Sequence, residues 1–336
     1  MEEATADPAA SNHPDPRAVP RHGGRALLMS CYLVALGIQW RLIGPPTRPV
    51  PIFLWLWAAE IAWNPTAPWR SHLRFVRDWG GLLLLLVAYT DSYRLVTVLG
   101  MPVHVRPPIR FDGALFGGTL PTLWLQRHLC GNPCTAADPA HWYDLLAAVV
   151  YSSHFVLSLS IAALLWLFAR SDFGRFMTRY LALTALGLAV YVLYPMAPPW
   201  WATGHGMLPH VARITDRGWD LVQLDFADAI ISKGQAMSDP VAAMPSMHAA
   251  TALFVAWVLI GRLRRRWRFL LLLYPAVMGG ALIYLGEHYL LDVLSGFATT
   301  AVVMTAVAGV ERWRVLRRIG RASPLRLVLT TGLTRR

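Results

Sequence analysis

Ala-Met-Pro-Ser-Met-His at residues 243–248 and Gly-Glu-His-Tyr-Leu-Leu-Asp at residues 286–292 are the two stretches around which the chain is organised. Each places a histidine, His248 or His288, at the start of a long apolar run. If the second run is helical from about Gly286, His288 and Asp292 share one helix face, and the carboxylate can accept a hydrogen bond from the imidazole. Enzymes orient a catalytic histidine in this way.

The composition around these stretches is that of a membrane protein. Of the 336 residues, 55% are hydrophobic and 15% are charged, which excludes an ordinary water-soluble domain. A helix needs about 20 residues to cross a bilayer, so the shortest apolar run is the weakest candidate span. The sequence predicts an all-α, polytopic membrane helical bundle with six to eight transmembrane helices. The apolar runs lie at about 26–44, 51–63, 80–99, 143–168, 177–195, 246–261, 268–285 and 289–310.

The chain divides into four predicted segments. Residues 1–24 are rich in proline and acids and have no apolar stretch, which predicts a disordered cytoplasmic tail and excludes a signal peptide. Residues 25–142 are predicted to hold the N-terminal membrane helices and an extracytoplasmic loop. Residues 143–310 form the membrane core that carries both histidines, and residues 311–336 form a basic cytoplasmic tail.

The formal net charge of +12 is distributed unevenly, because arginine collects in the short loop at residues 262–268 and in the loops at 64–79 and 169–176. By the positive-inside rule these loops and both termini are cytoplasmic. Because successive spans cross the membrane in opposite directions, the same assignment places both histidines on the extracytoplasmic face. An excess of basic residues that is distributed in this way indicates contact with anionic lipid and not binding of nucleic acid. We therefore expect an integral protein of a bacterial plasma membrane.

Cys130 and Cys134 flank a Gly-Asn-Pro turn in the first long outer loop. An oxidising compartment would let them form a disulfide, which is the prediction we adopt. The alternative is a metal site that also uses His128 and His141, but this spacing matches no zinc pattern. We expect neither a metal ion nor a cofactor.

The order of the motifs resembles a known family. Pro-Ser-Met-His ending at His248, followed by His-Tyr-Leu-Leu-Asp ending at Asp292, resembles the second and third motifs of the type 2 phosphatidic acid phosphatase superfamily. Pro-Pro-Trp at residues 198–200 and the stretch at 144–155 are similar to its inositol phosphorylceramide synthase-like branch. The Lys-x6-Arg-Pro motif of the wider superfamily is absent, and its Ser-Arg pair is replaced by Ala281 and Leu282. The resemblance implies a six-helix core.

The resemblance also implies roles for individual residues. His288, held by Asp292, would attack phosphorus to give a phosphohistidine, while His248 would protonate the departing lipid alkoxide. Backbone N–H groups at the start of the Ser246 helix can bind phosphate oxygens. Candidates for contacts with substrate or phosphate are Ser246, Pro198, Pro199, Trp200, His154, Arg94, Arg110 and Lys233, with Arg106 and Arg213 as further candidate cations.

Three ionisable side chains have a simpler interpretation. His154 and Asp91 lie in apolar runs, where hydrogen bonding between helices is the alternative to a role in the site. Glu287 is interpreted as a plain loop carboxylate.

Three functions from different classes are compatible with this pattern. The first is a lipid phosphotransferase resembling inositol phosphorylceramide synthase, which moves a phospho-head group between a lipid and an alcohol. The second is a lipid phosphate or polyprenyl phosphate phosphatase that uses water. The third, a non-enzymatic transporter, would carry charges along several spans near mid-membrane, whereas here they gather at one face. The missing phosphatase arginines favour the transferase. The expected partners are a membrane lipid substrate and the bilayer but no nucleic acid; protein partners are not indicated.

Overall fold

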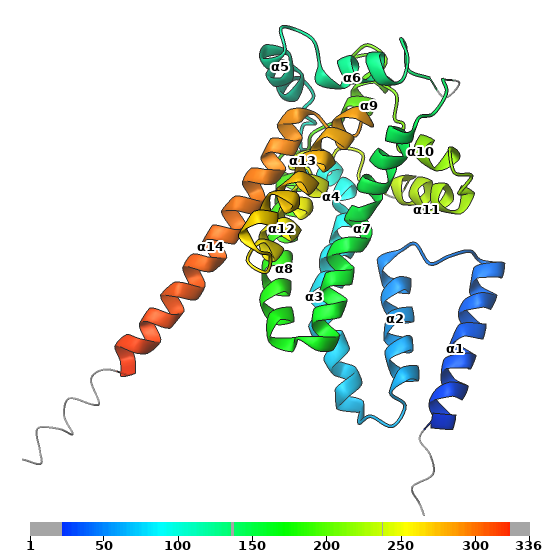
Figure 1. Cartoon of the computed structure of the whole chain (residues 1–336), viewed down its shortest axis with the longest axis vertical. Helices are drawn as coiled ribbons and strands as arrows, with labels where there is room; N and C mark the ends of the chain where they lie inside the picture. Colours follow the sequence, from blue (N-terminus) through cyan, green and yellow to red (C-terminus); the bar gives the residue numbers. More distant parts are fainter. Residues whose placement is uncertain (1–21, 136–137, 237, 323–336) are drawn as a thin grey trace, which may run out of the picture. The chain divides into compact units, whose positions relative to one another are not determined.

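The computed structural model describes residues 22–135, 138–236 and 238–322, and every regular element in these ranges is a helix (Figure 1). The predicted all-α class is confirmed. The helices are α1 (His22–Leu42), α2 (Pro49–Trp63), α3 (Trp69–Thr90), α4 (Ser92–Val98), α5 (Arg106–Leu115), α6 (Pro121–Leu129), α7 (Trp142–Phe168), α8 (Arg170–Leu193), α9 (Pro199–Gly204), α10 (Arg217–Asp220), α11 (Asp225–Ala236), α12 (Met247–Ile260), the 3₁₀ turn η1 (Arg265–Trp267), α13 (Arg268–Tyr284) and α14 (Leu290–Ala322).

A helix forms at each of the eight predicted apolar runs. Among the described residues, four helical segments are long and apolar enough to cross a membrane, namely α7, α8, η1 with α13, and α14; α3 and α4, bent by 51° at Asp91, make a fifth if they count as one span. The helices α2 and α12 are apolar but shorter, with 15 and 14 residues. This is an integral membrane protein, and the count of six to eight spans stays a prediction.

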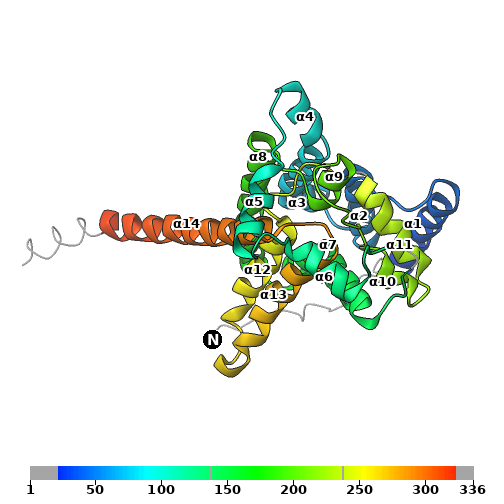
Figure 2. The ribbon, with the colours of Figure 1, turned by 90° about the horizontal axis from the view of Figure 1, so that it is seen from above.

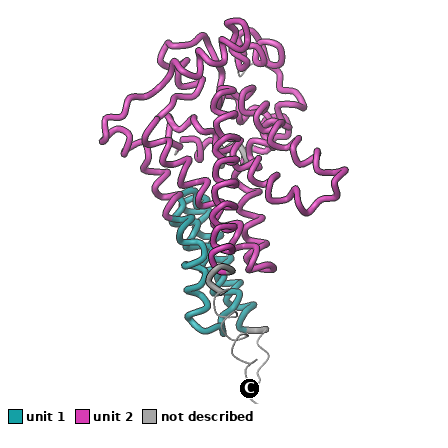
Figure 3. The backbone as a smooth tube through the Cα atoms, turned by 90° about the vertical axis from the view of Figure 1, so that its left-hand side faces the viewer, with its two compact units in different colours: residues 1–83 teal, residues 84–336 magenta. Residues whose placement is uncertain are grey.

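The predicted tails fall partly outside the described residues, which exclude 1–21 and 323–336. Residues 311–322, which we predicted as tail, continue helix α14. The chain packs as two compact units, residues 1–83 and residues 84–336 (Figure 3). This division by packing does not test the segment boundary at residue 143, which stays a prediction.

The first unit contains α1, α2 and the beginning of α3. Its buried histidine is paired with a carboxylate, as is usual for ionisable side chains in a membrane segment. Glu60 of α2 lies 2.7 Å from His72 Nδ1 of α3, and the indole N–H of Trp57 donates to the His72 carbonyl at 3.0 Å.

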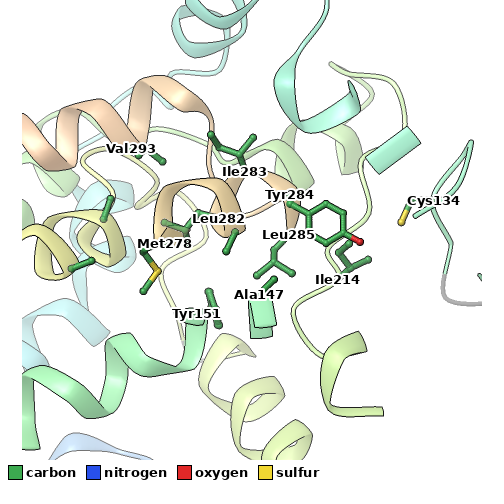
Figure 4. Close-up of a cluster of buried hydrophobic side chains, with 13 residues drawn as sticks. Cys134, Ala147, Tyr151, Ile214, Met278, Leu282, Ile283, Tyr284, Leu285 and Val293 are labelled. Carbon is green, nitrogen blue, oxygen red and sulfur yellow. The ribbon is translucent and has the colours of Figure 1, made fainter. Parts of the chain in front are cut away.

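The second unit holds the two histidine motifs. Its helix α12 packs against α7, α8, α13 and α14 (Figure 2), and the apolar core between them includes Met278, Leu282 and Leu285, none of which reaches solvent (Figure 4). At Gly296 of α14 a Cβ would collide with the carbonyl oxygen of Ser246. Small residues allow membrane helices to approach this closely. The glycine therefore brings the start of α12 against α14.

Ion pairs collect at the other end of these helices. Arg262, after α12, lies 2.8 Å from Asp172 near the start of α8, and Arg179 of α8 lies 2.7 Å from Glu311 of α14. The α7–α8 corner, the α12–α13 corner and the last third of α14 thus lie at one end of the bundle. The motif residues 243–248 and 286–292 lie at the opposite ends of α12 and α14.

Candidate functional site

The first motif is joined to the second through its backbone. Ser246 is the N-cap of α12, and its hydroxyl accepts a hydrogen bond from the Ala249 N–H at 3.3 Å. Its own N–H donates to the carbonyl oxygen of Asp292 at 3.0 Å. Ser246 is fully buried and does not line the cavity described below, so in this structure it is a helix cap.

The second motif adopts a different local structure from the predicted one. Helix α14 begins at Leu290, because Gly286 has a φ of +78° and turns the chain out of α13. His288 therefore precedes the helix, and the premise of a shared helix face was wrong. Asp292 nonetheless reaches it: Oδ2 accepts the Tyr289 N–H at 2.9 Å and lies 3.5 Å from His288 Nδ1. Asp292 therefore caps the start of α14, and in this position its carboxylate lies beside the His288 ring.

Asp112 of α5, which sequence reasoning missed, supports the same turn. Its carboxylate is fully buried and accepts the backbone N–H groups of Leu290 at 2.9 Å and Leu291 at 3.2 Å. Burial raises the pKa of Asp112 to about 6, against the lowering effect of these two hydrogen bonds. No local motif marks this residue, because its partners lie far along the chain.

Three histidines meet at the start of α12. The ring centroid of His248 lies 5.8 Å from that of His288 and 4.1 Å from that of His154 of α7. Tyr151 stacks on His248 at 4.8 Å, and His154 Nδ1 is held 2.7 Å from the Thr251 hydroxyl. His248 Nε2 is buried and has no hydrogen-bond partner among the described residues. A buried nitrogen without a hydrogen-bond partner in the protein is suited to form that bond with a bound substrate.

A cavity of about 250 Å³ lies in front of these histidines, within residues 84–336. One part of its wall is apolar and comes from α3, α7 and α8; another part is polar and comes from the segments around residues 213, 235 and 287. The apolar wall includes Leu86, Phe155 and Leu188, the polar wall includes Arg213, Gln235, Ser238, Asp239 and Glu287, and Pro198 and Trp200 also line the cavity. Burial raises the pKa of Asp239, although the Ser92 hydroxyl at 2.6 Å lowers it in part.

Glu287 is not a plain loop carboxylate. Its side chain is 8% exposed and accepts two hydrogen bonds from Arg213, from Nε at 2.7 Å and from Nη2 at 3.1 Å. Gln235 Nε2 donates to the same carboxylate at 3.2 Å, and the Arg213 guanidinium lies 4.5 Å from the Trp200 ring centroid. Burial lowers the pKa of Arg213, but the charge and hydrogen bonds of Glu287, with smaller contributions from Tyr151 and Asp216, together outweigh it and the net shift is upward.

The remaining predicted cations lie away from this cavity. Arg94, Arg110 and Lys233 are exposed on α4, α5 and α11, and none of them lines it. The reason is helical phase: α4 buries Ser92 and Val96, and α5 buries Pro108 and Asp112, so the arginine midway between each pair faces outward. Arg106 and Asp91 are likewise exposed, and Pro199 is buried at the start of α9 without lining the cavity.

Cys130 and Cys134 form a disulfide in the structure, with their Cα atoms 5.2 Å apart. Arg217 of α10 lies against it, donating from Nη1 to Cys130 Sγ at 2.6 Å and placing Nε 3.4 Å from Asp144 of α7. The loop that carries the disulfide is thereby attached to α7. The described residues contain no cluster of three or more histidine, cysteine and acidic side chains suited to a metal ion.

Comparison with known proteins agrees with this geometry. The family model of the PAP2 superfamily matches residues 123–326. The phosphoinositol dihydroceramide synthase of Bacteroides thetaiotaomicron is 28% identical over 210 residues, which are 59% of this chain and 65% of that protein.

Two fungal proteins are also similar. The inositol phosphorylceramide synthase catalytic subunit of Schizosaccharomyces pombe is 26% identical over 60% of this chain and 48% of its own length. The inositol phosphorylceramide synthase of Candida albicans is 28% identical over 46% of this chain and 33% of its own length. The chain thus aligns with less than two thirds of each of these three proteins, and no solved structure matches it. Because the matched model covers more than half of the chain and includes both histidine motifs, this protein belongs to the PAP2 superfamily.

Proposed function

We propose that this protein is a lipid phosphotransferase, which moves a phosphorylated head group from a membrane lipid to an alcohol. The observation that carries the proposal is the cavity that His248 and His288 share, in which Asp292 lies 3.5 Å from His288 Nδ1. Phosphoryl transfer needs a nucleophile, a proton for the leaving oxygen and groups that stabilise the phosphate. The two histidines and the aspartate supply the first two of these.

In the first half of the reaction His288 is the nucleophile. Its Nδ1 faces the Asp292 carboxylate, so Nε2 is the nitrogen left to attack phosphorus. As the N–P bond forms, the bond from phosphorus to the lipid oxygen breaks, and protonated His248 gives its proton to that oxygen. Asp292 stabilises the positive charge that develops on the His288 ring. The products are a neutral lipid alcohol and a phosphohistidine.

In the second half the roles of the groups reverse. His248, now neutral, accepts the proton of an acceptor hydroxyl as its oxygen attacks phosphorus, and the N–P bond breaks. His288 returns to its starting state. Water in place of the alcohol would make the protein a hydrolase, and a phosphatase if the donor is a lipid phosphate monoester.

The shape of the cavity supports a lipid substrate and a polar head group together. The wall formed by Leu86, Phe155 and Leu188 suits an acyl chain, whereas Arg213, Gln235 and Asp239 offer charges and hydrogen bonds. The relatives are named as a phosphoinositol dihydroceramide synthase and two inositol phosphorylceramide synthases, which supports transfer to an alcohol over hydrolysis. Ala281 and Leu282, where the resemblance predicts a phosphatase Ser-Arg pair, are buried in the core and do not line the cavity.

The test uses the purified chain in nanodiscs with phosphatidylinositol that is radiolabelled at phosphorus. With ceramide present as acceptor, we expect the label to move to a new lipid, and without an acceptor we expect little release. A labelled water-soluble phosphoester formed at the same rate with and without acceptor would identify a hydrolase instead. If the label stays on the donor with every donor and acceptor pair, the proposal fails.

We further propose that the site faces away from the cytoplasm. Arg175, Arg179 and Arg262 gather at the end of the bundle that holds the α7–α8 and α12–α13 corners, and such an end is cytoplasmic by the positive-inside rule. His248 and His288 lie at the other ends of their helices. Both chain termini are then cytoplasmic.

Single cysteines test this orientation in a Cys31→Ser background. Arg265→Cys and Met207→Cys both change exposed residues, whereas the neighbouring Gly206 is unsuitable because its φ of +69° disfavours a side chain. In intact cells a membrane-impermeant maleimide should label Met207→Cys only, and Arg265→Cys should react after the membrane is opened. Labelling of both cysteines in intact cells would contradict the proposed orientation.

A further inference from the structure

The segment that carries Arg213 is fixed against the end of α13. Gln126 of α6, a buried side chain, donates from Nε2 to the carbonyls of Ala212 at 2.7 Å and Tyr284 at 2.9 Å, and its Oε1 accepts the Ala212 N–H at 3.0 Å. The Ile214 N–H donates to the Leu285 carbonyl at 3.2 Å. The backbone on both sides of Arg213 is therefore tied to the residues that precede His288, through Gln126 at Ala212 and directly at Ile214.

The contact is closest at Gly286. A Cβ at this position would collide with the carbonyl oxygen of Ala212, so only glycine allows the two segments to meet. Arg213 then has Glu287 as its neighbour across this contact, and Glu287 is bonded covalently to His288. The guanidinium is thus built into the wall of the cavity beside the proposed nucleophile.

Arg213 is the only arginine or lysine that lines the cavity, within the part of the chain that the structure describes. Two of its five N–H donors, on the edge formed by Nε and Nη2, are engaged by one carboxylate in a two-point contact. A phosphate group matches the same edge with two oxygens, as a carboxylate does. The guanidinium cannot present this edge to both partners at once.

We propose, on the basis of the function proposed above, that Arg213 binds the phosphate of the substrate and that Glu287 occupies the guanidinium until this phosphate displaces it. An unpaired arginine in a half-buried site would be costly, and the carboxylate removes that cost while the cavity is empty. When Glu287 leaves Arg213 it keeps the Gln235 amide, 3.2 Å away in the present arrangement, as a partner. Glu287 is therefore an internal competitor of the phosphate and a positioning residue for Arg213.

The two members of the pair should respond to substitution in opposite directions. Glu287→Gln keeps the shape and one acceptor but removes the competing charge, so it should bind inorganic phosphate about tenfold more tightly and lower the KM for the phospholipid. Arg213→Gln should weaken phosphate binding by about tenfold or more and raise this KM. Phosphate binding is measured without turnover, from the rise in Tm of the purified protein with phosphate concentration, with chloride at equal ionic strength as the reference.

Two further variants serve as controls. Glu311→Gln removes the same type of partner from Arg179, 2.7 Å away at the other end of the bundle, and should leave the phosphate affinity unchanged. Glu287→Asp keeps the competing charge and should bind phosphate about as weakly as the parent protein. If Glu287→Gln leaves phosphate affinity unchanged or weakens it, the inference is wrong, whatever happens to Tm without phosphate.

The outcomes also separate this inference from the proposed function. If lipid transfer is observed and phosphate affinity does not respond to Glu287→Gln, the inference alone fails. If phosphate affinity responds as expected and no phosphoester is turned over, Arg213 binds phosphate but the proposed activity is wrong.

Discussion

Replacement of His288 by alanine is expected to abolish turnover of every phosphoester that the protein accepts, because it removes the proposed nucleophile, the one imidazole of the cavity that faces Asp292. The same variant should trap no labelled phosphohistidine when it is mixed with donor lipid and quenched under alkaline conditions, in which this linkage survives. The parent protein should trap it. A phosphorylated intermediate that persists in His288→Ala would assign the nucleophile to another residue.

Asp292→Asn tests the partner of that histidine. The amide keeps the shape and can still accept the Tyr289 N–H through its oxygen, but it no longer stabilises a positively charged His288 ring. By analogy with catalytic triads, the turnover number should fall by about 10³ to 10⁴. His128→Ala, which removes a histidine that is exposed on α6, is the matched control and should retain activity. Activity of Asp292→Asn within a few fold of the control would contradict the role of Asp292.

His248→Ala should lose activity in a way that depends on the leaving group. A lipid alkoxide leaves poorly without a proton, so transfer from a phospholipid should fall by about 10² to 10⁴, the usual contribution of general acid catalysis. A p-nitrophenyl phosphodiester needs no such proton, so the same variant should recover much of its activity on that substrate. His288→Ala should not recover.

Comparison of the two histidine variants on both substrates decides the assignment. Rescue of His288→Ala but not His248→Ala by the better leaving group would mean that nucleophile and acid are reversed. If neither substitution changes turnover on either substrate, the catalytic role of both motifs is wrong. Size-exclusion profiles and Tm of the purified variants distinguish loss of chemistry from loss of folding.

The sequence alone was sufficient for the features that depend on local order or on the bilayer. Long apolar runs must be helical in lipid, because every backbone polar group needs a partner within its own segment. The helices at the eight predicted runs follow from this. His288 and Asp292 are close because they are neighbours along the chain, so their pairing survived even though α14 begins at Leu290.

Only the tertiary structure identified the residues that reach the site from far along the chain. Asp112 contacts Leu290, Gln126 contacts Tyr284, and Arg213 contacts Glu287, and none of these pairs has a period or spacing that a sequence can display. The prediction of which cations line the cavity had mixed results, because it too depends on contacts between distant segments. Arg94 and Arg110 are directed outward by the phase of short helices, whereas Arg213 lines the cavity because Gly286 allows its backbone to approach α13. Charge and composition do not encode direction; packing decides which side of a helix or loop faces the cavity.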